Sequence, residues 1–245
     1  GQMLKIRHIW IPYYDKIRIR DGQMEIKPGQ LCLLQSEDEK TTQALVDLLL
    51  LKGKTIDERH IEIEGSWPDK IVGQTVYDLS RSVMDLGVYH RVDLGILKKW
   101  LRRLGLTRCR NRPCQQLSLA QRERAFFALN LSMMAELVIL SYPFTHQSPQ
   151  MIKRMVNGLE EACQDQAILI VTDKTPYFHH YHLYRTEKGY LHQVMVVENR
   201  DEQWDRMKLF LSLHTLLGMP LSYWLGILLI VALLALGISR IMSWR

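Results

Sequence analysis

Residues 31–42 read LCLLQSEDEKTT, and their pattern decides the type of fold. The continuous apolar run Leu31–Leu34 is typical of a β-strand that is buried on both faces. A short polar loop, Gln35–Glu39, follows it, and a helix-like pattern extends from Lys40 through Leu51. A strand, a loop, a Lys-Thr-Thr triplet and a helix, in this order, have the layout of a phosphate-binding loop.

The residues before this stretch alternate between apolar and polar side chains. Leu4–Ile9 and Ile17–Arg20 show the period of two that marks half-buried antiparallel strands, and Tyr13–Lys16 supplies the turn between them. A third alternating piece, Met24–Lys27, ends at a Pro-Gly pair. The N-terminus therefore predicts antiparallel strands that precede the phosphate-loop layout.

Two more apolar runs occur later in the chain, at Glu136–Leu140 and Ala167–Val171. A long helical stretch from Leu119 precedes the first run, and a second helical stretch, Pro149–Cys163, precedes the other. Strands that alternate with helices imply an α/β domain with a parallel central sheet. Residues 1–200 are enough for one such domain with a sizeable core.

The end of the chain is apolar. Leu221–Ile238 contains no charged residue, and a helix of this length, at about 1.5 Å per residue, spans roughly the 30 Å hydrocarbon core of a bilayer. Tyr223 and Trp224 at its entry, with Arg240 after it, suit the two interfaces. We expect a transmembrane anchor within residues 219–245 and a juxtamembrane amphipathic segment at 201–218, which lies either on the bilayer surface or against the domain.

Composition narrows the class of protein. The net charge of +6 arises from 32 basic and 26 acidic residues that are interspersed over most of the chain, so it suits a protein beside anionic lipid as well as one that binds nucleic acid. Lys98–Arg103 is more simply the solvated face of an amphipathic helix, and no nucleic-acid partner is expected.

The cysteines and histidines give no sign of a metal centre. The four cysteines form no framework of close pairs and are interpreted as reduced cytosolic thiols. The histidine-rich stretch Phe178–His182 alternates with aromatics and lacks a helical carboxylate partner. We therefore expect neither a metal ion nor another cofactor.

Four segments, in their order, carry a family resemblance. Glu25–Gly29 leads into the phosphate-loop layout, LSLAQRER stands at 117–124, ELVILSYPF at 136–144, and VTD at 171–173. The signature LSGGQRQR, the Walker B run LLLLDEPF and the switch-histidine motif VTH of ABC-transporter nucleotide-binding domains are similar to the last three. From about Leu4 to Val197 the chain resembles that family. The resemblance implies an α/β, ABC-type nucleotide-binding fold with a mixed sheet, antiparallel N-terminal strands and a helical subdomain.

The departures from the family pattern fall on the residues that carry its chemistry. The phosphate loop has no glycine, although glycines let backbone N–H groups converge on phosphate, and three consecutive carboxylates at 37–39 oppose a triphosphate. Ser141 and Tyr142 stand where the resemblance places the magnesium-binding aspartate and the catalytic glutamate, and Asp173 replaces the switch histidine. Leu119 and Ala120 replace two signature glycines.

The resemblance leaves a set of degenerate remnants of a nucleotide site. Tyr13 or Tyr14 corresponds to the aromatic residue that stacks on adenine in the family, although turn tyrosines that pack on a sheet are commoner. The remnants are Lys40, Thr41, Thr42, Tyr14, Ser118, Gln121, Ser141, Tyr142 and Asp173.

The resemblance and its departures together predict a pseudo-ATPase. We expect a non-catalytic, structural or regulatory subunit of a membrane complex, such as a transporter or an export assembly, in the inner (cytoplasmic) membrane with its soluble domain in the cytoplasm. Its expected partners are the lipid bilayer, a permease or another integral membrane subunit, an active ATPase paralogue or a second copy. The helical region expected at Thr75–Arg103 resembles the part of the family that grips the coupling helices of permeases. The alternative is a subunit that contributes a degenerate half-site to an ATPase heterodimer.

Overall fold

The apolar run at Leu31–Leu34 lies in β3 (Leu31–Ser36), at the centre of a six-stranded sheet in the order β5-β6-β7-β3-β8-β9. The computed structural model describes residues 4–13, 16–36, 38–50, 62–64, 68–73, 76–173, 178–187, 190–197, 215–216 and 219–242. Strand β3 and the strands β5 (Ile71–Val72), β6 (Leu137–Ser141), β7 (Ala167–Val171) and β8 (Tyr181–Glu187) pair parallel with one another, as expected for a parallel central sheet. Only β9 (Tyr190–Val197) pairs antiparallel, at the edge beside β8.

The side chains of β3 show why this strand is apolar throughout. Leu31 and Leu33 join one hydrophobic cluster, Cys32 and Leu34 join the other, and all four are fully buried. Because neighbouring side chains of a strand point to opposite faces, a strand covered on both faces needs apolar residues at every position. The predicted buried strand is confirmed.

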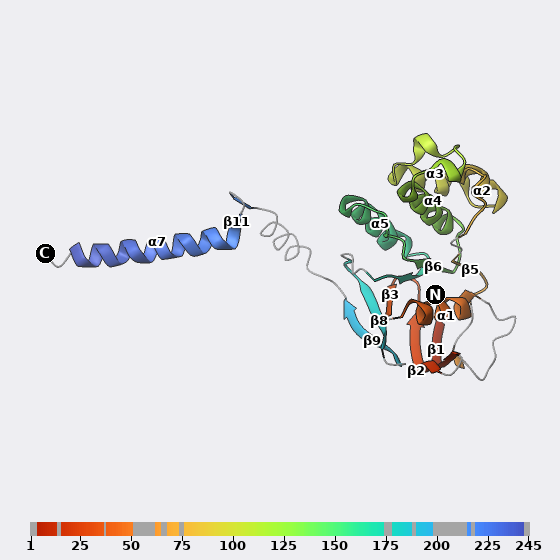
Figure 1. Ribbon diagram of the computed structural model, residues 1–245, viewed down its shortest axis with the longest axis horizontal. Helices are drawn as coiled ribbons and strands as arrows, with labels where there is room; N and C mark the ends of the chain where they lie inside the picture. The colour runs from red at the N-terminus through yellow and green to blue at the C-terminus, as the bar shows by residue number, and fades with distance from the viewer. Residues whose placement is uncertain are drawn as a thin grey trace. The chain divides into compact units, whose positions relative to one another are not determined.

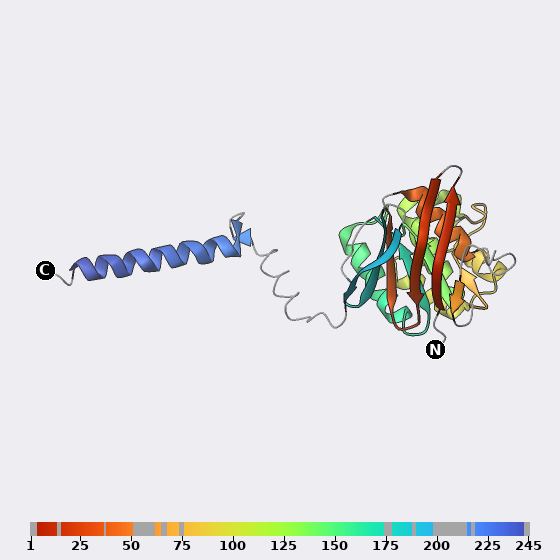
Figure 2. The same cartoon turned by 90° about the horizontal axis from the view of Figure 1, so that it is seen from below.

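The first face of the sheet is covered by α1 (Glu39–Leu50) and a small antiparallel sheet in the order β2-β1-β4 (Figures 1 and 2). Strands β1 (Leu4–Tyr13) and β2 (Lys16–Ile26) form the predicted antiparallel pair, and β4 (Glu62–Glu64) adds to β1. The third alternating piece, Met24–Lys27, is no separate strand, since β2 continues through Ile26.

The second face is covered by α4 (Leu119–Ser132) and α5 (Pro149–Ala162), which begin at the predicted positions. Helices α2 (Val83–Tyr89) and α3 (Leu94–Arg103) pack with α4 into a helical group (Figure 1). The short helices η1 (Thr107–Cys109) and η2 (Cys114–Gln116) connect α3 to α4. The helical part of the expected Thr75–Arg103 region therefore begins only at Val83, where Ser82 caps α2.

The chain divides into two units, residues 1–198 and 199–245. The second contains the strand pair β10 (Thr215–Leu216) and β11 (Met219–Pro220), followed by α7 (Leu221–Met242). Most of the predicted amphipathic segment at 201–218 lies outside the described residues. In the described helices, which include the side chains of α7 from 223 to 236, none is both long and apolar enough to cross a membrane.

Candidate functional site

The N-terminus of α1, where a phosphate-binding loop would hold its anion, is capped by a side chain of the chain itself. Asp38 Oδ1 accepts a hydrogen bond from the backbone N–H of Lys40 at 3.0 Å, and Asp38 Oδ2 accepts one from Thr41 Oγ1 at 3.0 Å. The backbone carbonyl of Asp38 accepts from the N–H groups of Thr41 and Thr42. Asp38 is thus an N-cap of the usual acidic type.

This cap has an electrostatic consequence. The first N–H groups of a helix carry a partial positive charge that attracts anions, and phosphate sites use it. Here a carboxylate already accepts from one of these groups, and Glu39 adds a second negative charge beside it. The end of α1 therefore presents negative charge where a nucleotide would need a positive cradle.

The Lys-Thr-Thr triplet is divided between solvent and core. Lys40 is exposed, whereas Thr41 and Thr42 are buried, at 6% and 1% exposure. Thr42 Oγ1 donates to the Asp38 carbonyl at 3.3 Å. In phosphate-binding loops the hydroxyl directly after the lysine faces a magnesium ion. Here that hydroxyl belongs to Thr41, and it donates to Asp38 Oδ2 instead.

Tyr142 stands at the end of β6 and reaches toward α1. Its N–H donates to the Val171 carbonyl at 2.7 Å. The ring packs on the hydrophobic cluster beneath α1. Burial, and then the negative charges of Glu39 and Asp173, raise the pKa of the phenol, so it stays neutral. The ring of Tyr142 therefore packs against the cluster that contains Leu45 and Leu49 of α1.

The backbone of Tyr142 is strained. Its φ is +49°, in the left-handed region that a bulky residue rarely adopts, at a cost of about 1–3 kcal/mol. Ser141, the residue before it, is half-buried and lies in register with Val171. Asp173 is exposed beyond the end of β7. Tyr142 and Asp173 therefore follow two strands, β6 and β7, that pair with each other.

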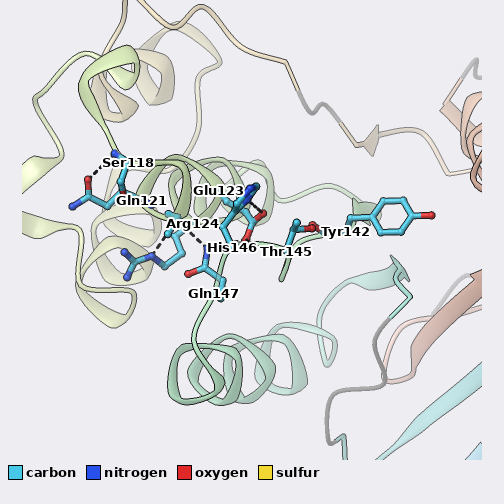
Figure 3. Close-up of polar contacts among 9 residues, drawn as sticks. Ser118, Gln121, Glu123, Arg124, Tyr142, Thr145, His146 and Gln147 are labelled. Carbon is cyan, nitrogen blue, oxygen red and sulfur yellow. Dashed lines mark hydrogen bonds and ion pairs between the residues drawn. The ribbon is translucent and has the colours of Figure 1, made fainter.

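The signature-like segment has a local structural role at the start of α4. Ser118 Oγ accepts from the N–H of Gln121 at 3.1 Å, and Gln121 Oε1 accepts from the N–H of Ser118 at 3.0 Å (Figure 3). These two bonds form a capping box, in which the side chain of each residue accepts the backbone N–H of the other. Leu119 is 60% exposed just beyond the cap, so an apolar side chain stands in solvent there.

A cluster of hydrogen bonds, which the sequence analysis did not predict, connects the segment after β6 to α4. Glu123 accepts from the N–H and Nδ1 of His146, at 3.1 and 2.9 Å, and from Gln147 Nε2 at 2.8 Å (Figure 3). Gln147 also donates to the Ala120 carbonyl, and Thr145 to the Tyr142 carbonyl. The cluster fixes the path of the chain beyond Tyr142, while the phenol itself points away from it.

Two further sequence predictions concern binding groups. Tyr14 lies outside the described residues, so its stacking role is untested. Within the described part of the chain, no three His, Cys, Asp or Glu side chains gather closely enough to hold a metal ion. All four cysteines are free and buried. His179 pairs with Glu160 at 2.7 Å and links the residues just before β8 to α5.

Comparison with solved structures identifies the fold. The chain is similar to an ATP-binding subunit of an ABC transporter, at 13% identity, a TM-score of 0.65, and coverage of 84% of this chain and 94% of that one. It is also similar to a nucleotide-free ATP-binding cassette from an ABC transporter, at 14% identity, a TM-score of 0.63, and coverage of 85% and 96%. No family model and no curated protein sequence matches. The expected ABC-type nucleotide-binding fold is confirmed at the level of the fold.

Proposed function

We propose that this chain is a non-catalytic, ABC-type subunit that serves a structural or regulatory role in a membrane transport or export assembly. The observation that carries the proposal is the Asp38 cap on α1. A carboxylate accepts the N–H of Lys40 and the hydroxyl of Thr41 at the point where a nucleotide phosphate would need those groups. A nucleotide must displace this cap and tolerate the nearby charge of Glu39.

The end of β6 supports the same conclusion. Activation of an attacking water and coordination of Mg²⁺ in phosphoryl transfer rely on carboxylates at this edge of the sheet. Ser141 and Tyr142 supply hydroxyl groups instead, and burial keeps the Tyr142 phenol protonated by raising its pKa. Neither group acts as an anionic metal ligand or as a carboxylate base.

A membrane anchor in the C-terminal unit completes the proposal. The sequence of α7 is uncharged over Leu221–Ile238. Three of its apolar side chains, Leu225, Leu228 and Leu233, are 57–63% exposed. Such a helix is stable in an apolar environment. We expect a single pass through the inner membrane, with the folded domain in the cytoplasm.

Docking to a membrane protein is supported by apolar residues beside α2. Val76, Val88 and Tyr89 are exposed at 76%, 62% and 65%, and the guanidinium of Arg81 lies 4.8 Å from the centre of the Tyr89 ring. Exposed aromatic and arginine side chains are frequent anchors of protein interfaces. The proposed partners are a permease or other integral subunit, an ATPase paralogue or a second copy.

Equilibrium binding of labelled Mg²⁺-ATP to the full chain in nanodiscs tests the loss of catalysis. We expect no affinity tighter than millimolar and no hydrolysis above that of empty discs. A fold-matched active ABC ATPase in the same discs serves as the positive control. Micromolar affinity or steady turnover by the chain itself contradicts the proposal.

Membrane topology is tested separately. A cysteine added after Trp244 should react from outside the cell with an impermeant maleimide. Reaction only after permeabilisation reverses the proposed orientation, and release of the full chain by alkaline carbonate refutes the anchor.

The alternative function, a subunit that contributes a degenerate half-site to an ATPase heterodimer, makes a different prediction. It requires the start of α4 to receive a nucleotide of a partner, yet Ser118 and Gln121 are joined in the capping box and Leu119 projects beside them. Substitution of Leu119 by serine should leave any ATPase activity of a purified complex unchanged. If activity is lost while the complex stays assembled, the subunit contributes to a live site.

A further inference from the structure

The positive charge of the chain is concentrated in the helical group. Residues 76–132 contain eleven Lys and Arg against four Asp and Glu, an excess of seven, whereas the whole chain has a net charge of only +6. The remaining residues are therefore nearly neutral, with a small negative balance. Such a separation creates a strong local field that a uniform distribution would lack.

Within this group, residues 94–112 contain seven basic residues and no carboxylate. Five of the seven are exposed and have no ion-pair partner among the described residues. We call these five the basic face: Lys98, Lys99, Arg102, Arg108 and Arg112. Arg103 does not belong to it, because Arg103 Nη2 binds both carboxylate oxygens of Glu161 at 2.8 Å.

The helix that presents much of this face is held rigidly. Leu97, Trp100 and Leu101 of α3 are buried in the core, and Asp93 caps the helix by accepting from two backbone N–H groups. The bond between Arg103 and Glu161 ties α3 to α5. The exposed cations therefore project from a fixed support.

We propose that the basic face binds the anionic headgroups of a phospholipid bilayer. The inference rests on the proposed membrane anchorage, since an anchored chain keeps its domain within reach of the lipid surface. A Lys or Arg near an anionic membrane strengthens association about fivefold, so five of them give a substantial attraction without any specific pocket.

The composition of the face favours lipid over other anionic partners. The only aromatic residue in 94–112 is Trp100, which is 8% exposed and gives no platform for stacking on bases. No large apolar side chain of this run is among the exposed ones, so the face lacks the anchors that dominate protein interfaces. Charge without anchors fits a diffuse, laterally mobile layer of headgroups.

The test uses the full chain in nanodiscs with a fluorescent donor on Thr107→Cys, which is exposed in η1, and an acceptor on the lipids. The native thiols are buried and do not compete for the label. Energy transfer should rise when phosphatidylglycerol is mixed into phosphatidylcholine discs. About 1 M salt should abolish the rise, because it shortens the Debye length to about 3 Å.

Two charge-matched variants decide the assignment. Lys98→Glu/Lys99→Glu should weaken the response to anionic lipid at least about 25-fold, because two attractions are lost and two repulsions appear. Lys27→Glu/Lys40→Glu, which makes the same change of charge outside the basic face, should retain it. If the chain remains on the discs and energy transfer is equal in both lipids, the basic-face proposal alone is overturned. If the chain is lost from the zwitterionic phosphatidylcholine discs, the membrane anchor is refuted. If the chain binds a labelled oligonucleotide tightly and energy transfer does not respond to anionic lipid, the basic face binds nucleic acid and the lipid proposal is also overturned.

Discussion

Replacement of Asp38 by alanine removes the cap of α1, and its cost follows from the bonds that are lost. The Asp38→Ala variant loses the acceptor of the Lys40 N–H and of the Thr41 hydroxyl, together with a negative charge at a helix N-terminus. Loss of an N-cap costs about 1 kcal/mol, and the charge adds about 0.3–1 kcal/mol. We expect a total loss of about 1–2 kcal/mol in the free energy of unfolding, which lowers Tm by roughly 2–8 °C in a domain of this size.

Two further variants separate the hydrogen bond from the charge. Asp38→Asn keeps an acceptor and should lose only about 0.3–1 kcal/mol, and this difference should shrink in about 1 M salt. Asp38→Gly should lose about 0.5–1.5 kcal/mol, because glycine leaves the first N–H groups open to water but the favourable negative charge is gone.

Thermal unfolding of the full chain in nanodiscs, followed by circular dichroism, measures the series. If Asp38→Ala equals the wild type, or if Asp38→Asn is as unstable as Asp38→Ala, the carboxylate is no cap and the reasoning fails. Added Mg²⁺-ATP should raise the Tm of none of the variants, because Tyr142 and Glu39 are unchanged. A rise for Asp38→Ala alone means that this one side chain closes the site.

Three more predictions concern the rest of the domain. Burial raises the pKa of Cys32 to about 12 from an ordinary 9.0. Mass spectrometry should therefore find Cys32 unalkylated by iodoacetamide at about pH 8 until the chain is unfolded. The free energy of unfolding should fall as the pH rises from about 9 toward 12, because the unfolded chain loses the thiol proton first. Gly158→Ala places a Cβ 2.5 Å from Trp100 Cζ3 and should cost about 1–3 kcal/mol in urea unfolding; an unchanged midpoint contradicts the close packing. Met134→Gly should stabilise by about 0.5–1 kcal/mol, because Met134 is 53% exposed with φ of +51° after α4, whereas Met134→Ala should give no gain.

The order of the elements was predictable because the signals are local. Apolar runs placed β3, β6 and β7 correctly, and the helices after Ser118 and Ser148 begin where the sequence predicts. The start of α2 was less predictable. Asp78 accepts from the N–H and hydroxyl of Ser80, which forms a turn in a stretch that reads as helical by comparison with the family.

The chemistry of the site was predictable only in part. The sequence shows that carboxylates oppose a nucleotide, but it does not show that Asp38 turns toward α1 and caps it. The capping box of Ser118 and Gln121 was readable as a local Ser-x-x-Gln pattern, yet both residues were interpreted through the family signature. The pair of Glu123 with His146 joins α4 to the segment after β6, and no local sequence pattern predicts such a contact.

The central position of β3 has a consequence for how this protein is made. Both neighbours of β3, β7 and β8, lie roughly 140 residues further along the chain, so they leave the ribosome roughly 7–30 s later at ordinary rates of synthesis. During that interval Leu31–Leu34 has neither partner strand, and its unpaired backbone N–H and C=O groups are open to wrong pairing. The apolar helix α7 is translated soon after β9 ends. We therefore expect the nascent chain to need protection from aggregation twice in quick succession, first at an unpaired strand and then at an apolar helix.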